Sequence, residues 1–391
     1  MESGMSASTD GRSGPLKGIN VIELAGIGPA PFAGMVLADL GATVTRVDRP
    51  ATAAPAGFGG GARVGDPMGR GKRSVAIDLK QPDGVELVLE LCVDADVLIE
   101  GFRPGVTERL GVGPAPCLAR NPALVYGRMT GFGQDGPLAT APGHDINYIS
   151  IGGALGSIGR EGQPPTPPLN LIGDFGGGGM LLVVGVLGAI LHARTTGEGQ
   201  VVDAAMVDGT ALLMAPLLTG SRRQWSGRGR GILDSGAHFY DVYETADGGY
   251  VSVGAIEPQF YADLLARTGI DPAALPAQMD GSGWPEAKRV LADVFRTKSR
   301  DEWCALLEGT DACVTPVLEP SEVEHHRHNV ARGMFVEVDG MLQAAPAPRF
   351  DRTPATVASG SPTLGAHTDE VLGALRSADE LAALRRVGII A

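Results

Sequence analysis

Two short polar segments contain the residue types best suited to chemistry. The first, Gly143-His144-Asp145-Ile146-Asn147-Tyr148, follows a proline-rich loop and precedes an apolar stretch. A helix N-terminus beside His144 favours the neutral imidazole, which can act as a base. A polar pair that only caps the helix explains this segment equally well.

Asp174 is the candidate in the second segment. It lies about thirty residues after His144, in Leu169-Asn170-Leu171-Ile172-Gly173-Asp174-Phe175, and four glycines follow at the start of another expected helix. Two proton-transfer groups of different type, each at the mouth of a buried helix, indicate general acid–base chemistry in one cleft. A capping role for Asp174 without catalysis stays open.

A glycine turn after the first expected strand suggests a dinucleotide-binding loop. Gly26-x-Gly28 follows that strand, and Asp48 stands about twenty residues later, where such folds place the acid that binds the ribose. Pro31, however, occupies the position of the third glycine, and Pro29 with Pro31 removes two N–H groups from the turn. Nicotinamide binding is therefore disfavoured.

Three further motifs carry less weight. Gly131-x-Gly133-x-x-Gly136 is followed at once by Pro137, so it predicts a turn rather than a phosphate loop. The sequence contains no G-x-S-x-G nucleophile motif. The cluster His325-His326-Arg327-His328 could bind a metal, but it lies among charged residues and is more typical of a solvated connection. We expect no metal site.

The segments that must position His144 and Asp174 alternate between strand-like and helical patterns. Strands alternating with helices predict a parallel sheet with helices on its faces. We expect strands at 19–24, 43–47, 74–79, 96–100 and 124–129, helices at 32–40 and 83–93, and a surface loop at 51–71.

The second half of the chain has a different texture. The apolar runs 176–191 and 204–218 predict long helices, and two alternating runs at 239–243 and 250–253 around Asp247-Gly248 predict a hairpin. Helices are expected at 258–268, 286–295 and 300–308. We therefore expect a disordered tail at 1–15, a large domain beginning with 16–200, a helical linker at 201–230, a small domain at 231–325, and a linker and return to the large domain at 326–391.

Composition excludes several classes of protein. The chain of 391 residues has 32 Lys and Arg against 45 Asp and Glu, and this net charge of -13 opposes binding to nucleic acid. The four cysteines show no metal-ligand spacing and predict reduced, mostly buried thiols. The apolar run 176–191 is shorter than the roughly 20 residues that a bilayer requires, so we expect a buried helix and no membrane span.

Taken together, ten motifs resemble the α-methylacyl-CoA racemases of the family III CoA-transferase superfamily. The resemblance runs from about residue 16 to 348. Its motifs are Leu24-Ala25-Gly26-x-Gly28-Pro29, Val47-Asp48-Arg49-Pro50, Arg70-Gly71-Lys72-Arg73-Ser74, Asp78-Leu79-Lys80, Arg103-Pro104-Gly105-Val106, Thr130-Gly131-Phe132-Gly133-Gln134, the 143–148 segment, Asp174-Phe175-Gly176-Gly177-Gly178, Gly199-Gln200-Val201-Val202-Asp203-Ala204 and Gly254-Ala255-Ile256-Glu257-Pro258-Gln259-Phe260-Tyr261.

The resemblance implies both a fold and a reaction. The fold is α/β, with a large Rossmann-like parallel-sheet domain that binds CoA and a smaller α+β domain, in an interlocked homodimer. The reaction is epimerisation of a 2-methyl-branched acyl-CoA thioester at C2, in lipid and fatty acid metabolism. No cofactor is implied, since CoA is part of the substrate.

The resemblance also assigns roles to residues. His144 would take the C2 proton from the (S)-epimer, Asp174 would take it from the (R)-epimer, and Glu257 would orient or tune the histidine. Backbone N–H groups at a helix start near Asp145 could hold the enolate oxygen. The expected CoA contacts are Arg49, Ile77, Asp78, Leu79, Lys80, Gly101, Phe102, Arg103, Arg109, Gly143, His144, Asp145, Ile146, Asn147 and Tyr148.

Some features depart from the family or leave alternatives. The glycine-rich loop at 51–69 is longer than usual, and the last 40 residues match poorly. A CoA-transferase that uses Asp174 as a nucleophile is the main alternative, and a CoA-binding module without activity is a distant one. Met206, Met214 and Leu217 could line an acyl site, but their helical spacing is more typical of core. No peroxisomal signal is seen at 387–391, so we expect the cytoplasm.

Overall fold

The protein is described by a computed structural model that covers residues 11–50, 66–220 and 227–391. The chain forms two compact units. Unit 1 comprises Met1–Gly152, Leu169–Leu213 and Gly333–Ala391, and unit 2 comprises Gly153–Pro168 and Met214–Arg332. Most of the predicted tail and of the predicted 51–71 loop lies outside the described residues. Residues 153–168, which the sequence assigned to the large domain, belong to unit 2.

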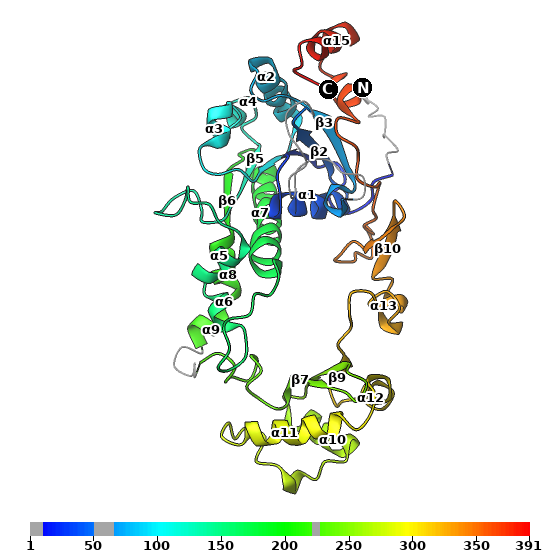
Figure 1. The fold of residues 1–391 in the computed structure, drawn as a ribbon. Helices are drawn as coiled ribbons and strands as arrows, with labels where there is room; N and C mark the ends of the chain where they lie inside the picture. Colours follow the sequence, from blue (N-terminus) through cyan, green and yellow to red (C-terminus); the bar gives the residue numbers. More distant parts are fainter. Residues whose placement is uncertain (1–10, 51–65, 221–226) are drawn as a thin grey trace. The chain divides into compact units, whose positions relative to one another are not determined.

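Unit 1 is built on a parallel sheet, as the sequence predicts, but the sheet has six strands rather than the five expected. The strand order is β3-β2-β1-β4-β5-β6, and every neighbouring pair is parallel (Figure 1). This is the order of doubly wound folds. Strands β2 and β3 are added on one side of β1, and strands β4 to β6 are added on the other side. The strands are β1 (Asn20–Leu24), β2 (Thr43–Asp48), β3 (Lys72–Ala76), β4 (Val97–Glu100), β5 (Val125–Thr130) and β6 (Val201–Ala205).

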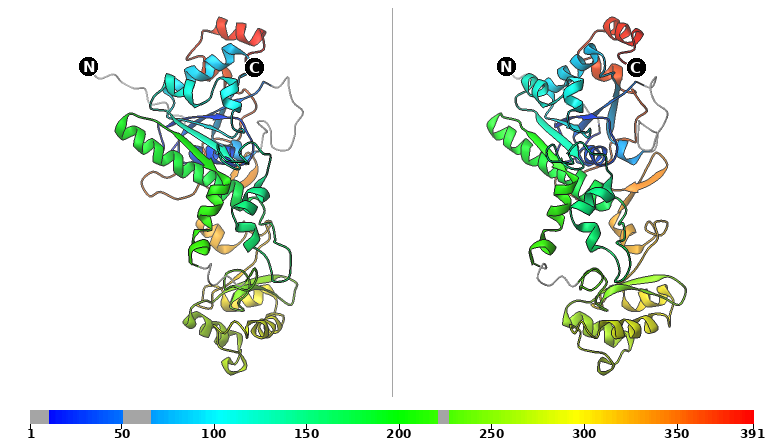
Figure 2. Two further views of the ribbon diagram at one scale, coloured as in Figure 1. Left: turned by 90° about the vertical axis from the view of Figure 1, so that its left-hand side faces the viewer. Right: turned by 60° about the vertical axis from the view of Figure 1, so that its left-hand side comes forward.

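Helices cover both faces of this sheet (Figure 2). Because successive side chains of a strand point to opposite faces, Val21 packs into one core and Ile22 into the other. The first core includes side chains from α1 (Pro29–Asp39) and α7 (Leu181–Thr196). The second includes side chains from α2 (Pro82–Leu91), α4 (Pro114–Arg120), α14 (Thr368–Leu372) and α15 (Ala378–Arg386).

Helix α1 begins earlier than the predicted residue 32. Pro29 and Pro31 lie in its first turn, where an α-helix has no intrahelical acceptor for backbone N–H groups and proline costs nothing. Gly28 precedes the helix with a φ of 68°, a left-handed conformation that favours glycine. The two prolines that argue against a dinucleotide loop therefore start a helix.

The long apolar helix predicted after Asp174 is present and begins as a π-helix, η4 (Leu171–Met180), which α7 continues. Glycine is required where η4 meets α8 (Met206–Leu213), because a Cβ on Gly209 would lie 1.8 Å from the carbonyl oxygen of Gly177. By length and composition Leu171–Thr196 could also cross a membrane, and 44% of its most apolar part is buried inside the protein.

The single helix predicted over 204–218 is wrong. The structure instead has strand β6, then α8, then α9 (Ala215–Gly220). Strand β6 was missed because its five residues include Asp203 and run directly into an apolar helical sequence. Its register on β5 places Val202 opposite Gly127 and Ala204 opposite Met129, which buries Ala204 and Ala205.

Unit 2 contains the predicted hairpin within an antiparallel sheet of three strands. β7 (Tyr240–Glu244) pairs with β8 (Tyr250–Gly254), and β8 pairs with β9 (Val314–Pro316). Helices α10 (Pro258–Thr268), α11 (Trp284–Phe295) and α12 (Arg300–Leu307) pack with this sheet around buried Phe239, Phe295 and Trp303. The remaining elements of the unit are α6 (Ala154–Ser157), α9, η5 (Pro272–Ala274) and α13 (Arg327–Arg332).

The last part of the chain belongs to unit 1. Arg70 joins it to the sheet domain, because its guanidinium binds Asp39 and also donates to the Gln343 side chain and the Ala344 carbonyl. A hairpin of β10 (Phe335–Val338) and β11 (Met341–Ala344) was not predicted. The other elements of unit 1 are η2 (Pro67–Gly69), η3 (Cys92–Asp94), α3 (Val106–Leu110) and α5 (Asp145–Ile151).

Candidate active site

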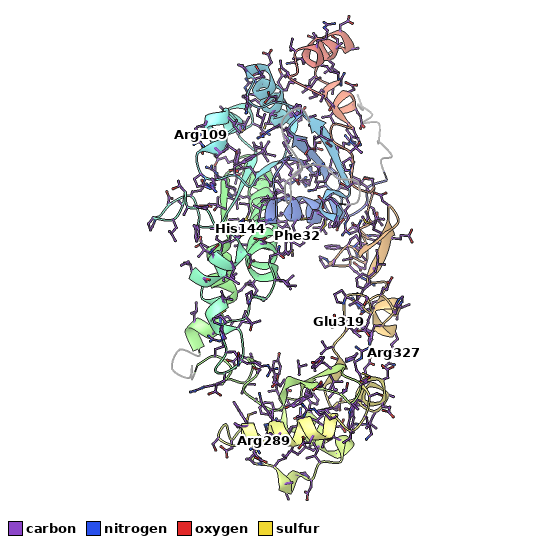
Figure 3. All side chains as sticks on the ribbon, viewed as in Figure 1. Phe32, Arg109, His144, Arg289, Glu319 and Arg327 are labelled. Carbon is purple, nitrogen blue, oxygen red and sulfur yellow. The ribbon has the colours of Figure 1, made fainter. Side chains whose placement is uncertain are left out.

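His144 is placed by the start of helix α5. It is the residue before the helix, with extended backbone angles, and its N–H donates to the Asn147 side chain at 3.0 Å. Asn147 thereby closes the first turn and fixes the direction in which the chain enters the helix. The imidazole is exposed, at a point on unit 1 labelled in Figure 3. His144 is therefore anchored by its main chain and open to a ligand.

Asp174 lies in the π-helix η4 and is half-buried. Its Oδ2 accepts a hydrogen bond from the Asn170 side chain at 3.1 Å. Burial raises the pKa of Asp174, and the charge of Asp145 raises it further, whereas the Asn170 hydrogen bond and nearby His144 oppose this increase. A carboxylate with a raised pKa is a stronger base than a solvated one.

Asp145 joins the two segments. Its Oδ2 accepts a hydrogen bond from the backbone N–H of Asp174 at 2.7 Å. This contact requires glycine at position 173, because a Cβ there would lie 2.5 Å from the same oxygen. The sequence suggested that the His144 and Asp174 segments meet in one cleft, and the structure brings them together in unit 1.

Tyr148 closes the inner side of this site. It is buried, its hydroxyl donates to the Gly143 carbonyl, and its ring packs edge-on against Phe132 with centroids 4.9 Å apart. A Cβ on Gly131 would lie 2.1 Å from the Tyr148 ring. Gly131 is thus needed for packing, and the second glycine motif lies in bends that lead into a turn at 137–140. Burial and the charge of Asp174 raise the pKa of Tyr148.

The site lies at the carboxyl edge of the sheet, where the loops after β1 and β4 meet. Ligands of doubly wound folds bind at this switch point. A Cβ on Gly28, in the loop after β1, would lie 3.5 Å from Asp174 Oδ2. A Cβ on Gly101, after β4, would lie 3.1 Å from the Cβ of Ala30. Small residues therefore let the two loops and η4 approach one another.

The expected CoA contacts follow the same edge. Arg49 follows β2, residues 77–80 follow β3, and residues 101–103 follow β4. The side chains of Arg49, Lys80, Arg103 and Arg109 are exposed, and no ion pair joins them to another described residue. Arg109, on α3, is labelled in Figure 3. Ile77 is instead buried, so only its main chain could contact a ligand.

Buried ion pairs lie among the strands of the sheet that carries these loops. Lys72 Nζ lies 2.6 Å from Glu23 Oε2, and both side chains are fully buried. Glu100 accepts hydrogen bonds from Arg128 at 3.1 Å and from the backbone N–H of Phe102 at 2.6 Å. The second bond fixes the start of the loop that carries Arg103. Burial raises the pKa of Glu100 to about 7, although Phe102 and Arg128 oppose the increase.

Two of the discussed positions lie elsewhere in the chain. Glu257 is in unit 2, exposed, as the residue before α10, and its action on His144 stays a prediction. The histidine cluster is in the same unit, where His326 Nε2 lies 3.1 Å from Glu308 Oε1. Within the described residues no group of three His, Cys, Asp or Glu side chains could hold a metal.

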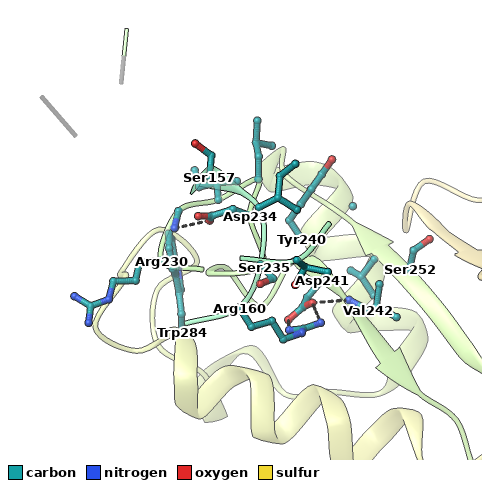
Figure 4. A pocket seen from close by; sticks show the side chains of 18 of the residues that line it. Ser157, Arg160, Arg230, Asp234, Ser235, Tyr240, Asp241, Val242, Ser252 and Trp284 are labelled. Atoms are coloured by element: carbon teal, nitrogen blue, oxygen red, sulfur yellow. Dashed lines mark hydrogen bonds and ion pairs between the residues drawn. The ribbon is translucent and has the colours of Figure 1, made fainter. Parts of the chain in front are cut away.

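A cavity of about 1260 Å³ lies within unit 2 (Figure 4). Its lining is mainly apolar and includes Met214, Leu217 and Trp284. At its polar side Arg160 donates to both carboxylate oxygens of Asp241, at 3.1 and 2.8 Å. Met214 and Leu217, which their spacing assigned to the core, thus line a cavity.

Sequence reasoning missed two contributions to the site. Asn170 was quoted only as part of the Asp174 segment, although its position four residues before Asp174 is the spacing at which side chains of one helical face meet. The bond from Asp174 N–H to the Asp145 carboxylate had no sequence signal, because it joins two separate segments.

All four cysteines are free, with Cys92 and Cys117 buried and the other two partly exposed.

Comparisons with known proteins agree on one family. The family model described as CoA-transferase family III matches residues 16–368. The chain is 48% identical to alpha-methylacyl-CoA racemase of Mus musculus over 361 residues and to that of Homo sapiens over 362, covering 91% of this chain and 92% of each relative. Among solved structures, a CAIB/BAIF family protein from Brucella suis is similar with a TM-score of 0.80 and 26% identity, over 93% of this chain and 100% of that one.

Proposed function

The chain belongs to the CoA-transferase family III, and on this premise we propose that it is an α-methylacyl-CoA racemase, which interconverts (2R)- and (2S)-2-methylacyl-CoA thioesters. The observation that supports this most is the pairing of two different proton-transfer groups. The His144 and Asp174 segments are joined by the hydrogen bond from Asp174 N–H to Asp145. A second base is what a racemase needs and a CoA-transferase does not.

The reaction follows from the acidity of the C2 proton next to the thioester carbonyl. One base removes this proton and a planar enolate forms. The other base, which lies on the opposite face in its protonated form, then donates a proton to C2. In this proposal His144 acts on the (S)-epimer and Asp174 on the (R)-epimer. The thioester itself delocalises the charge, so no cofactor is required. The free N–H groups in the first turn of α5 would bind the enolate oxygen.

Acyl-CoA binding is assigned to the carboxyl edge of the sheet. The phosphates of CoA require cations, and the exposed Arg49, Lys80, Arg103 and Arg109 supply them within an acidic protein. The loops at 77–80 and 101–103 and the segment 143–148 complete the proposed site. Lipid metabolism is the corresponding setting.

We further assign the active form to a homodimer in which Glu257 acts at the active site. Several large apolar side chains on η4, α7 and α8 are exposed in the isolated chain, among them Leu171, Val184, Leu191 and Leu212. Such surfaces are typical of contacts between chains. Light scattering on the purified protein tests the oligomeric state.

The experiment that tests the reaction is incubation of one epimer of a 2-methylacyl-CoA with the enzyme in deuterated water. We expect loss of optical purity together with deuterium at C2. In the alternative, Asp174 attacks the thioester, releases CoA and forms an acyl anhydride. Transfer of CoA to a free acid without deuterium uptake would establish that alternative.

Substitution of each base gives the second test. His144→Ala and Asp174→Ala should each lower epimerisation by about 10²–10⁴-fold, while each retains deuterium exchange from the epimer that the remaining base serves. The exposed His192 and Asp83 provide matched alanine controls on unit 1. Loss of less than about tenfold in a folded variant would exclude that residue as a base.

A further inference from the structure

The carboxylate of Asp145 has an unusual environment for the first residue of a helix. It is 5% exposed, and its hydrogen bond goes to Asp174 in η4 rather than to an N–H of its own helix α5. The other oxygen, Oδ1, is buried without a hydrogen-bond partner among the described residues. A buried oxygen without a hydrogen-bond partner costs free energy.

The local sequence is built to keep this carboxylate in place. Gly173 leaves room for it, since a Cβ there would lie 2.5 Å from Oδ2 and 2.9 Å from Cγ. On its other side Asp145 follows His144, whose main chain is fixed by Asn147. One side chain thus connects the backbone of one proposed base to the backbone of the other.

We propose that Asp145 is a positioning residue of the racemase, whose carboxylate fixes the main chain of Asp174 relative to His144 and sets the electrostatic environment of the Asp174 side chain. This inference rests on the proposed function. It concerns the side chain of Asp145, apart from any contact of residues 143–148 with CoA.

The charges around Asp174 are consistent with this role. Burial raises the pKa of Asp174 most, and Asp145 adds to this increase, whereas the hydrogen bond from Asn170 and the charge of His144 lower it. Tyr148 also interacts electrostatically with Asp174, Arg103 and Asp145. Loss of the Asp145 charge therefore moves the pKa of Asp174 down and weakens it as a base.

Asp145→Asn tests the charge with the shape preserved. An amide oxygen can still accept the Asp174 N–H, so the fold is kept. We expect kcat to fall about 10- to 100-fold with KM changed less than about threefold, because misplacement of a base affects the chemical step. The acid limb of the kcat/KM profile should move to lower pH. Asp145→Ala, which also removes the acceptor, should lose more activity.

Asp96→Asn is the matched control. The Asp96 carboxylate also accepts a backbone N–H, from Asn20 at 2.8 Å, but at the amino end of the sheet. It should leave kcat and the pH profile unchanged. An unshifted acid limb in folded, otherwise normal Asp145→Asn would overturn the proposal. The proposal would also be overturned if Asp145→Asn failed to fold while Asp96→Asn folded, because Asp145 would then be needed for folding rather than for catalysis. Wild-type enzyme without deuterium exchange would instead refute the proposed function.

Discussion

Ile77 and Ile390, from segments far apart in the sequence, form an antiparallel β-bridge at the carboxyl end of β3. The N–H of Asp78 donates to the Ile389 carbonyl at 2.8 Å, and the N–H of Ala391 donates to the Ala76 carbonyl at 3.2 Å. Both bridging side chains are buried. The bridge extends the pairing just beyond the edge strand β3 and holds the start of the 77–80 segment, a proposed CoA contact.

Ile390→Ala should weaken the binding of acyl-CoA to the 77–80 segment. We expect a several-fold increase in KM with a smaller change in kcat, together with a loss of about 2–5 kcal/mol in the free energy of unfolding. Steady-state kinetics and urea denaturation measure the two effects. Leu381→Ala, in the same core but on α15, should lose comparable stability with KM unchanged. An equal KM increase in both variants would show that general loosening is the cause.

Arg49→Ala and Arg103→Ala should each raise KM for acyl-CoA about ten- to a hundredfold, with a smaller effect on kcat. A charge-assisted contact to phosphate contributes roughly 1.5–3 kcal/mol, and it is made equally in the ground and transition states. The effect should shrink with acyl-pantetheine, which lacks the nucleotide phosphates. Arg120→Ala, which removes a surface pair with Glu86, is the control. Wild-type binding in both arginine variants would refute the assigned CoA site.

Lys72→Met should destabilise the protein by roughly 3–5 kcal/mol, because it leaves the fully buried Glu23 carboxyl group without its partner. The double variant Lys72→Met/Glu23→Leu should recover most of this loss, since no charge is then buried at that point. Urea denaturation gives both values. Disruption of the exposed Arg120–Glu86 pair should cost at most about 1 kcal/mol. A double variant as unstable as the single one would mean that packing, not charge, determines the effect.

Glu100 should make stability depend on pH. Burial raises its pKa from 4.5 to about 7, so the folded state binds more protons than the unfolded state between these values. Its contribution is therefore fully present below about pH 4.5 and is lost as the pH rises through about 7. Glu100→Gln should flatten this dependence by about 1–3 kcal/mol in unfolding measurements from pH 5 to 8. The exposed Glu86→Gln should not, and an identical slope in Glu100→Gln would contradict the assignment.

Local patterns in the sequence determined most of the elements. The alternating runs on either side of Asp247-Gly248 specified the β7–β8 hairpin, and helix α10 has the predicted bounds 258–268. These two predictions succeeded because turn chemistry and side-chain periodicity depend on only a few neighbouring residues. Strand β6 escaped prediction because its stability comes from pairing with β5 in the sheet, a contact that its own residues do not signal.

The candidate bases also followed from the sequence, since His144 and Asp174 are titratable residues at the starts of apolar helices. The tertiary structure alone decided which atoms join them. The Asp145 carboxylate reaches the Asp174 amide because helix α5 packs against η4, and Ile390 meets Ile77 because the last residues lie along the edge of β3. Such contacts depend on how whole elements pack, and no residue type or spacing within one segment determines that packing.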